Sequence, residues 1–139
     1  SALKLEGKDF KAYLETRALL ECHAAKLTAS RADENEFQEL LLAHEAFCEQ
    51  VNMDLPGLEQ DMAFHIKIAD LCKNTVLSTL IRLIIPELLR LSRDLDTCRD
   101  ARYRIALKDH ARIYEAIASR DGDEAAQAMQ KHIEKIIYV

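Results

Sequence analysis

Apolar residues recur every three or four positions along most of the chain, with polar residues between them. Such a recurrence places the apolar side chains on one face of an α-helix. It predicts helices over about 9–29, 35–52, 56–73, 75–95, 102–120 and 122–137. We therefore predict an all-α protein, an antiparallel bundle of about six to seven helices joined by short connections.

Helix-starting and helix-breaking residues refine this picture. Pro56 suits the first turn of a helix, and Asp33 or Asn35 can cap the helix that follows them, as Asp123 can cap the last one. Pro86 lies inside the apolar stretch 75–95, where it removes a backbone hydrogen bond, so we expect a kink or a break there. That stretch is apolar nearly all round, which predicts a central position or a subunit interface. The charged stretch 94–102 is predicted to be a connection.

Length and charge exclude several classes of protein. The 139 residues suffice for one domain, and the formal net charge of −5 disfavours contact with nucleic-acid phosphates. No apolar run approaches the roughly 20 residues that a membrane span needs. No secretory leader pattern is visible, and the four cysteines form no C-x-x-C pair, so we expect a cytoplasmic protein with reduced thiols and no contact with a membrane.

The stretch DMAFHIKIADLCKN, residues 61–74, carries the most informative polar residues. Asp61 and His65 are four residues apart, so they project from one helical face, which Ile68 and Cys72 continue. A carboxylate and an imidazole therefore point towards the interior. Burying each without a partner would cost roughly 2–7 kcal/mol, so both need one.

Two further histidines share this inward orientation. His110 lies on the face of Ile113 and Ile117, and His132 lies on the face of Met129 and Ile136. One histidine of this kind is usually a hydrogen-bonded core residue. For three histidines and an aspartate from three helices, two interpretations stay open: hydrogen-bonded core residues, or a site for zinc or a related transition metal.

At these residues the chain resembles the C-terminal ligand-sensing domain, called FCD, of the FadR subgroup of GntR-type bacterial transcription regulators. ETRALLECHAAKLTA is similar to the family's R-x-x-L-E-x-x-A-A-x-L-A, and DMAFHIKI to D-x-x-F-H-x-x-I. DHARIYEAIASRD is similar to E-H-x-x-I-x-x-A-I-x-x-R-D, and DEAAQAMQKHI to A-x-x-A-M-x-x-H. The last two histidines are 22 residues apart, as in the family, and the resemblance covers nearly the whole chain.

The resemblance implies roles for individual residues. Asp61, His65, His110 and His132 match the family's metal ligands, which implies a divalent metal: zinc, with nickel, manganese or iron as alternatives. Arg17 matches the arginine that pairs with the carboxylate of a small-acid effector in such domains, and Asn74 matches a polar residue of the same cavity. Asp109 stands where the family often has Glu, and we expect it to be solvated.

The resemblance also implies a place in a larger protein. Residues 1–139 would form an effector-binding and dimerisation domain, and the family's N-terminal winged helix-turn-helix is absent from this chain. Contact with DNA would occur only through that missing domain. We predict a transcription-regulator domain that binds a small carboxylate metabolite at a buried metal and forms a homodimer, and not an enzyme.

Several alternatives stay open at this point. The metal could serve a hydrolase, although H-E-x-x-H is missing, or it could be purely structural. Arg17 could lie at the surface, paired with Glu21, and Asn74 could cap a helix. Arg82, eight residues after Asn74 on roughly the same face, is a further candidate for ligand binding. No role is expected for His23 or His44.

Overall fold

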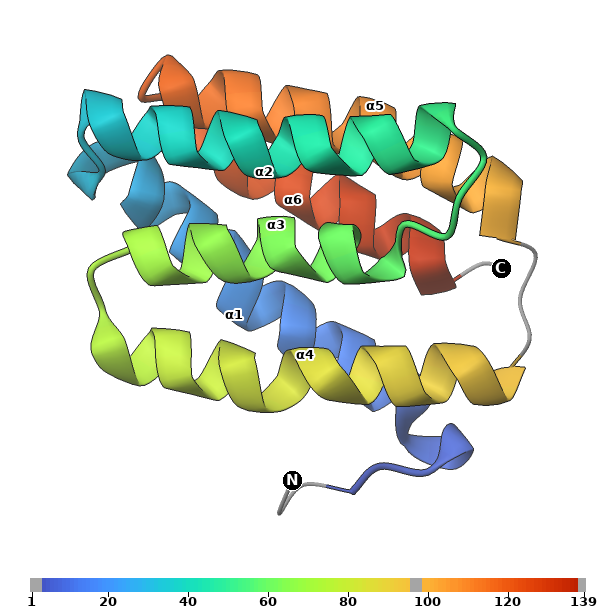
Figure 1. Cartoon of the computed structure of the whole chain (residues 1–139). Helices are drawn as coiled ribbons and strands as arrows, with labels where there is room; N and C mark the ends of the chain where they lie inside the picture. The colour runs from blue at the N-terminus through green and yellow to red at the C-terminus, as the bar shows by residue number, and fades with distance from the viewer. Residues whose placement is uncertain (1–3, 96–98, 138–139) are drawn as a thin grey trace.

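The computed structural model describes residues 4–95 and 99–137, which form an all-α domain (Figure 1). A short 3-10 helix, Gly7–Asp9, precedes six α-helices: α1 Phe10–Arg31, α2 Glu34–Asn52, α3 Leu58–Leu71, α4 Thr75–Leu95, α5 Arg99–Ala118 and α6 Gly122–Ile137. No strand occurs in these described ranges, which confirms the predicted fold class.

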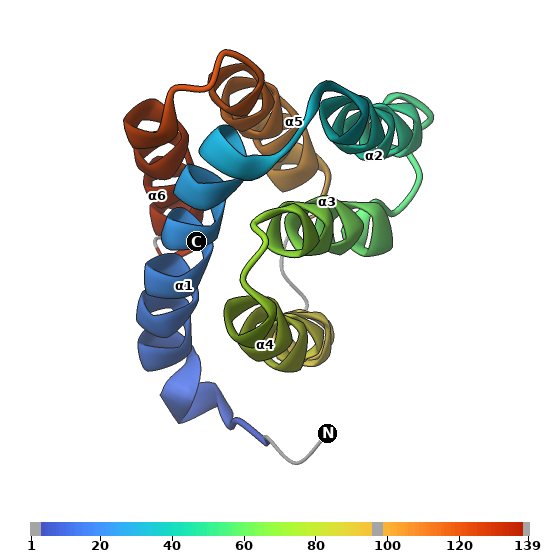
Figure 2. The same cartoon turned by 90° about the vertical axis from the view of Figure 1, so that its left-hand side faces the viewer.

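Helix α1 is the central element of the bundle. It packs against α3, α4, α5 and α6, and Figure 2 shows it beside α6, on the side of the domain opposite α2. Its buried alanines, Ala18, Ala24, Ala25 and Ala29, belong to the main hydrophobic core. Side chains this small let the neighbouring helices come close to α1, so groups on α1 lie in the middle of the domain.

Helix α4 lies at the edge of the bundle, where it packs mainly on α1 and α3 (Figure 2). The prediction offered a central position or a subunit interface, and the structure rules out the central position. Ile81 and Ile85 face the core, whereas Val76, Leu80 and Leu83 are 70%, 42% and 40% exposed. Helix α4 therefore has one apolar face in the core and a second one at the surface.

The proline in α4 does not interrupt the helix, which continues through Pro86 from Thr75 to Leu95. The prediction of a break was wrong. Pro86 is exposed, so the carbonyl that loses its backbone donor can bind water instead. The hydroxyl of Tyr13 donates a 2.9 Å hydrogen bond to the Ile84 carbonyl and fastens this part of α4 to α1.

The structure differs from the prediction at three other helix termini. Helix α3 begins at Leu58 with Gly57 as its N-cap, so Pro56 lies in the preceding turn. Helix α6 is capped by Asp121, which accepts a hydrogen bond from the Glu124 amide, and not by Asp123. Helix α5 starts at Arg99, so the charged stretch 94–102 is partly helical, and residues 96–98 lie outside the described chain.

The N-terminus of α2 follows the prediction closely. Asp33 accepts a hydrogen bond from the Glu36 amide, and the Glu36 side chain accepts one from the Asp33 amide. This reciprocal arrangement satisfies two amides that would otherwise lack partners. Across the described part of the chain, every helix is too short or too polar to cross a membrane.

Candidate metal centre

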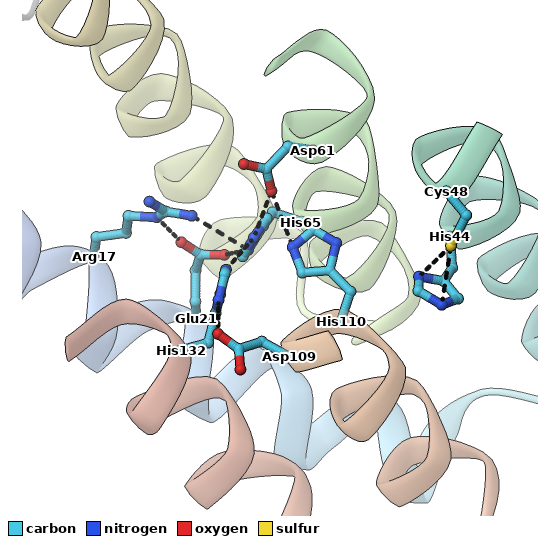
Figure 3. A network of polar contacts seen from close by, with 9 residues as sticks. All are labelled: Arg17, Glu21, His44, Cys48, Asp61, His65, Asp109, His110 and His132. Atoms are coloured by element: carbon cyan, nitrogen blue, oxygen red, sulfur yellow. Dashed lines mark hydrogen bonds and ion pairs between the residues drawn. The ribbon is translucent and has the colours of Figure 1, made fainter. Parts of the chain in front are cut away.

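The four predicted metal ligands meet inside the bundle (Figure 3). Helix α3 supplies Asp61 and His65, α5 supplies His110, and α6 supplies His132. The three histidines are 5% exposed or less, and one donor atom from each of the four residues lies within 4.8 Å of the others. The folded chain thus brings together, in one small volume, residues that span the sequence from 61 to 132.

The distances between donor atoms suit a single ion. Asp61 Oδ1 lies 3.3 Å from His65 Nε2 and 3.0 Å from His110 Nε2, and the Nε2 atoms of His65 and His132 are 3.3 Å apart. A tetrahedral zinc ion with ligand bonds of about 2.0–2.1 Å would separate its donors by about 3.3 Å. These three distances therefore match the donor spacing of a zinc site, within a cluster whose donor atoms all lie within 4.8 Å of one another.

The hydrogen-bonding pattern also points to a cation. Asp61 Oδ1 and both ring nitrogens of His110 are buried without a hydrogen bond to any described residue. Leaving such groups unpaired costs about 1–3 kcal/mol each. An ion at the common point would satisfy the Asp61 oxygen and one nitrogen of His110, so the donor set fits a divalent metal.

Two carboxylates orient His65 and His132 through contacts with their Nδ1 atoms. Glu21 Oε1 contacts His65 Nδ1, and Asp109 Oδ2 lies 2.9 Å from His132 Nδ1. An ionised carboxylate only accepts hydrogen bonds, so each Nδ1 carries a proton, and in a neutral ring the Nε2 atom keeps its lone pair. Two such lone pairs 3.3 Å apart repel each other unless a proton or a metal ion lies between them. Burial lowers the pKa of His65, but the carboxylate of Glu21 outweighs burial and raises it, so a proton can occupy this place when no metal does. Such carboxylate–histidine pairs are common behind metal ligands.

Asp109 and Glu21 were not recognised as site residues. The prediction that Asp109 is solvated was wrong, since it is 4% exposed and binds both His132 and Lys135 Nζ, the latter at 2.6 Å. The sequence did hold a signal for Glu21, because Glu21 follows Arg17 by four residues and precedes the buried Ala24 and Ala25 on one helical face. A charged residue on a buried face needs a partner nearby.

Arg17 combines features of both predictions: it is buried, as a ligand-binding arginine would be, and it pairs with Glu21, as was expected only for a surface arginine. It is 1% exposed, and its Nε donates to Glu21 Oε2. Its Nη2 lies 3.3 Å from His65 Nδ1, and its Nη1 has no hydrogen-bond partner among the described residues. Figure 3 shows this third nitrogen directed away from both Glu21 and His65. A guanidinium in the core thus keeps a free donor.

Burial and charge shift the pKa values of this group. Burial alone would raise the pKa of Glu21, but Arg17 and His65 outweigh it and lower that pKa to about 2. Burial lowers the pKa of His110 to about 3, and it lowers the pKa of His132 as well. Burial opposes ionisation of Asp61, yet His110 and His65 hold its pKa well below the usual value. At neutral pH the site therefore contains ionised carboxylates beside neutral His110 and His132.

An aromatic wall holds His110 in place. The His110 ring stacks on Phe64 with a centroid distance of 4.3 Å, and Phe47 lies 4.8 Å away on centroids. His44 is buried beside the same rings, 5.9 Å from Phe64, so it is packed more fully than its sequence neighbours suggested. His23 is exposed and belongs to no cluster.

The other two candidate ligand residues lie elsewhere. Asn74 Oδ1 accepts a 3.0 Å hydrogen bond from the Leu77 amide, which makes it the N-cap of α4. Arg82 is at the surface, where its Nε donates to Asp70 Oδ1 at 3.0 Å. The structure does not bring either side chain to the four candidate metal ligands.

A small hollow adjoins the buried charges. It lies between α1 and α4, is partly open to the outside, and is too narrow for a water molecule. Its lining combines two charged groups with four aliphatic side chains: Arg17, Glu21, Leu20, Ile81, Ile84 and Ile85. A ligand could enter only if α4 or its side chains moved outward.

Comparison with known proteins supports the resemblance seen in the sequence. The family described as the FCD domain matches residues 12–135. HTH-type transcriptional regulator LutR of Bacillus subtilis is 29% identical over 98% of this chain and 64% of its own length. The Uxu operon transcriptional regulator of Escherichia coli is 30% identical over 88% of this chain and 50% of its own length.

Solved structures share the fold. Streptococcus agalactiae GntR superposes with a TM-score of 0.83 at 24% identity, covering 95% of this chain and 60% of that one. E. coli McbR/YncC gives a TM-score of 0.82 at 14% identity, covering 97% of this chain and 65% of that one. The chain spans one-half to two-thirds of the length of these proteins. The curated relatives are transcription regulators and not enzymes, in agreement with the prediction.

Proposed function

Because this chain belongs to the FCD domain family, the effector-binding domains of GntR-type transcription regulators, we propose that it senses a small organic acid at a buried divalent metal. Asp61, His65, His110 and His132 would hold the ion, with zinc as the first choice. The observation that carries this proposal is the convergence of four buried or nearly buried donor atoms, one from each of these residues, within 4.8 Å of one another.

The chain's own residues prepare the ion's surroundings. Glu21 and Asp109 keep the protons of His65 and His132 on Nδ1, so the Nε2 atoms stay available as ligands. A bound metal would supply a Lewis-acidic centre with open positions for a carboxylate oxygen. Four protein ligands leave one or two such positions, and Phe64 and Phe47 keep water away from His110.

Arg17 would hold the acid from the other side. Its Nη1 is a buried donor without an acceptor, and an effector carboxylate would provide one. Hydrogen bonds between a guanidinium and a carboxylate are charge-assisted and roughly twice as strong as neutral ones. The acid would therefore bridge the metal and α1, the helix that contacts most of the bundle.

The signal would pass to a DNA-binding domain in a longer protein. LutR and the Uxu regulator are longer than this chain, and both are transcriptional regulators by name. We propose that the acid favours one helix arrangement over another, because a ligand shifts an equilibrium only by its differential affinity for the two states. That arrangement would set the separation of two DNA-binding domains.

A homodimer is part of this proposal. Paired DNA-binding domains require two copies related by a twofold axis. The exposed apolar side chains of Val76, Leu80 and Leu83 recur on α4 at the spacing of one helical face and offer a surface for the second copy. Light scattering of the purified chain should give twice the monomer mass, and Leu80→Asp should reduce it towards the monomer value.

The decisive experiment combines metal analysis with thermal unfolding in the presence of small acids. The purified chain should contain about one divalent ion per copy, and a chelator should lower its unfolding temperature. Adding an acid at 100 times its Kd should then stabilise the zinc-loaded protein by about 2.7 kcal/mol and leave the chelated protein unchanged.

Matched variants make this test specific. His110→Ala should abolish both metal retention and the acid response, whereas His23→Ala, at an exposed position, should preserve both. Zinc binding without any acid response would favour a purely structural metal site. Metal-dependent hydrolysis of a carboxylate ester would favour the hydrolase alternative. A metal-free protein that does not bind zinc would refute the proposal.

A further inference from the structure

We infer that the acid recognised by this domain is a small monocarboxylate with an aliphatic body, and not a dicarboxylate or a polyhydroxylated acid. This inference rests on the proposed function and narrows its ligand class. It is carried by the hollow between α1 and α4, where buried Arg17 and Glu21 face a wall of aliphatic side chains. Both charged residues also contact His65, one of the four candidate metal ligands, and so connect the hollow to the metal centre.

The first observation is the composition of the wall. Apart from Arg17 and Glu21, the hollow is lined by Leu20, Ile81, Ile84 and Ile85, none of which offers a side-chain hydrogen bond. Each hydroxyl that a ligand places against this wall would lose its water without gaining a partner, at a cost of roughly 1–3 kcal/mol. An alkyl group would instead bury apolar surface there favourably. The wall therefore selects against sugar-like acids.

The second observation is the balance of buried charge. Arg17 and Glu21 form a buried ion pair and neutralise each other, which leaves the charge of Asp61 on the metal-binding residues. A divalent ion on Asp61 and three neutral histidines gives the site a single excess positive charge. One carboxylate cancels that charge. A second carboxylate would lie unpaired in the core beside Glu21, where an uncompensated charge is strongly unfavourable.

The third observation concerns size. The hollow is too narrow to admit even a water molecule, so only a small acid can fit, and only when the wall moves outward. The free Arg17 Nη1 supplies the donor for its carboxylate. Helix α4 can yield because it lies at the bundle edge and packs mainly on α1 and α3 (Figure 2).

Three acids with one four-carbon skeleton test the inference: 2-hydroxybutyrate, malate and threonate, all of one configuration at the hydroxylated carbon. They share the same head group for a metal and differ in the rest of the molecule, which is an alkyl group, a second carboxylate or further hydroxyls. Calorimetric titration of the zinc-loaded full chain should show 2-hydroxybutyrate binding at least tenfold more tightly than the other two. Metal analysis after each titration verifies that the acid has not extracted the zinc.

Two variants locate the selectivity. Ile84→Thr should reduce the preference for 2-hydroxybutyrate over threonate about tenfold, since one buried group of this size changes discrimination by roughly 10–200-fold. The matched control is Ile105→Thr, the same substitution on α5 at a position that is 49% exposed, which should leave the preference unchanged. Glu21→Gln removes one buried negative charge. It should increase the affinity for malate, relative to that for 2-hydroxybutyrate, at least tenfold.

The possible outcomes separate this inference from the proposed function. Malate or threonate binding as tightly as 2-hydroxybutyrate would overturn the inference and leave the acid sensor standing. Equal effects of Ile84→Thr and Ile105→Thr would show that the wall does not select the ligand, which also overturns the inference. If no acid binds the zinc-loaded protein, the proposed function itself fails.

Discussion

Charged side chains occur in two contrasting regions of this protein. In the core, Arg17 and Glu21 are 1% exposed, and both contact His65, one of the four candidate metal ligands. At the surface, Arg82 and Asp70 form an equally direct pair, yet the two side chains are 53% and 34% exposed. Water solvates the surface charges whether or not they pair. The buried charges have no such alternative, so their positions are fixed by one another.

This difference explains why only one of the two regions can respond to a ligand. A surface ion pair contributes about 0–1 kcal/mol and is screened by salt. Breaking a buried pair costs about 3–5 kcal/mol, because the remaining charge stays in the core. A ligand that satisfies a buried donor such as Arg17 Nη1 can therefore exert a large differential effect on the helices around it.

The largest effect is expected from removing Glu21. Glu21→Ala leaves Arg17 buried without its counterion and should lower the free energy of unfolding by about 3–5 kcal/mol, measured by urea denaturation of the metal-free protein. Glu15→Ala, at an exposed position of the same helix, is the matched control and should change it by less than about 0.5 kcal/mol. Equal effects of the two substitutions on the free energy of unfolding would show that the buried pair stabilises the fold no more than an exposed residue does.

Asp109 offers the next test, since it orients His132 and does not touch the ion. Asp109→Ala should weaken zinc affinity about 10–100-fold, the usual effect of removing a carboxylate behind a metal-bound histidine. Competition with a chromophoric chelator measures this affinity. The exposed Asp123→Ala serves as control, and unchanged zinc affinity in Asp109→Ala would contradict an orienting role for Asp109.

Asn74 tests whether a polar residue outside the metal centre stabilises the fold or binds the ligand. Asn74→Ala should destabilise the domain by about 1 kcal/mol through loss of the α4 N-cap, whereas Asn74→Asp keeps the cap and should be nearly neutral. Neither variant should alter acid affinity if capping is the only role. A parallel loss of affinity in both would assign Asn74 to the ligand site.

The smallest effect is expected at the surface pair. Arg82→Ala should cost less than about 1 kcal/mol, and less still in high salt. The affinity of the Arg82→Ala variant for the acid, measured by calorimetric titration, should equal that of the unchanged protein. A tenfold loss of affinity would place Arg82 at the ligand after all and would weaken the contrast between the two regions.

The sequence by itself determined the helices and the four residues that converge. Apolar periodicity places His65, His110 and His132 on buried helical faces, because an α-helix fixes which residues share a side. The same periodicity located most helix boundaries to within a few residues. The motifs around these histidines were sufficient to identify the family, whose match to residues 12–135 covers the whole site.

The tertiary structure alone decided how the polar groups are paired. Glu21 and His65 are 44 residues apart, and Asp109 and His132 are 23 apart, so no helical spacing could predict these contacts. Packing also decided that Arg82 faces Asp70 at the surface and that Ile84 borders the hollow. A helix pattern specifies which face is buried, whereas the neighbour that meets that face depends on how the helices cross.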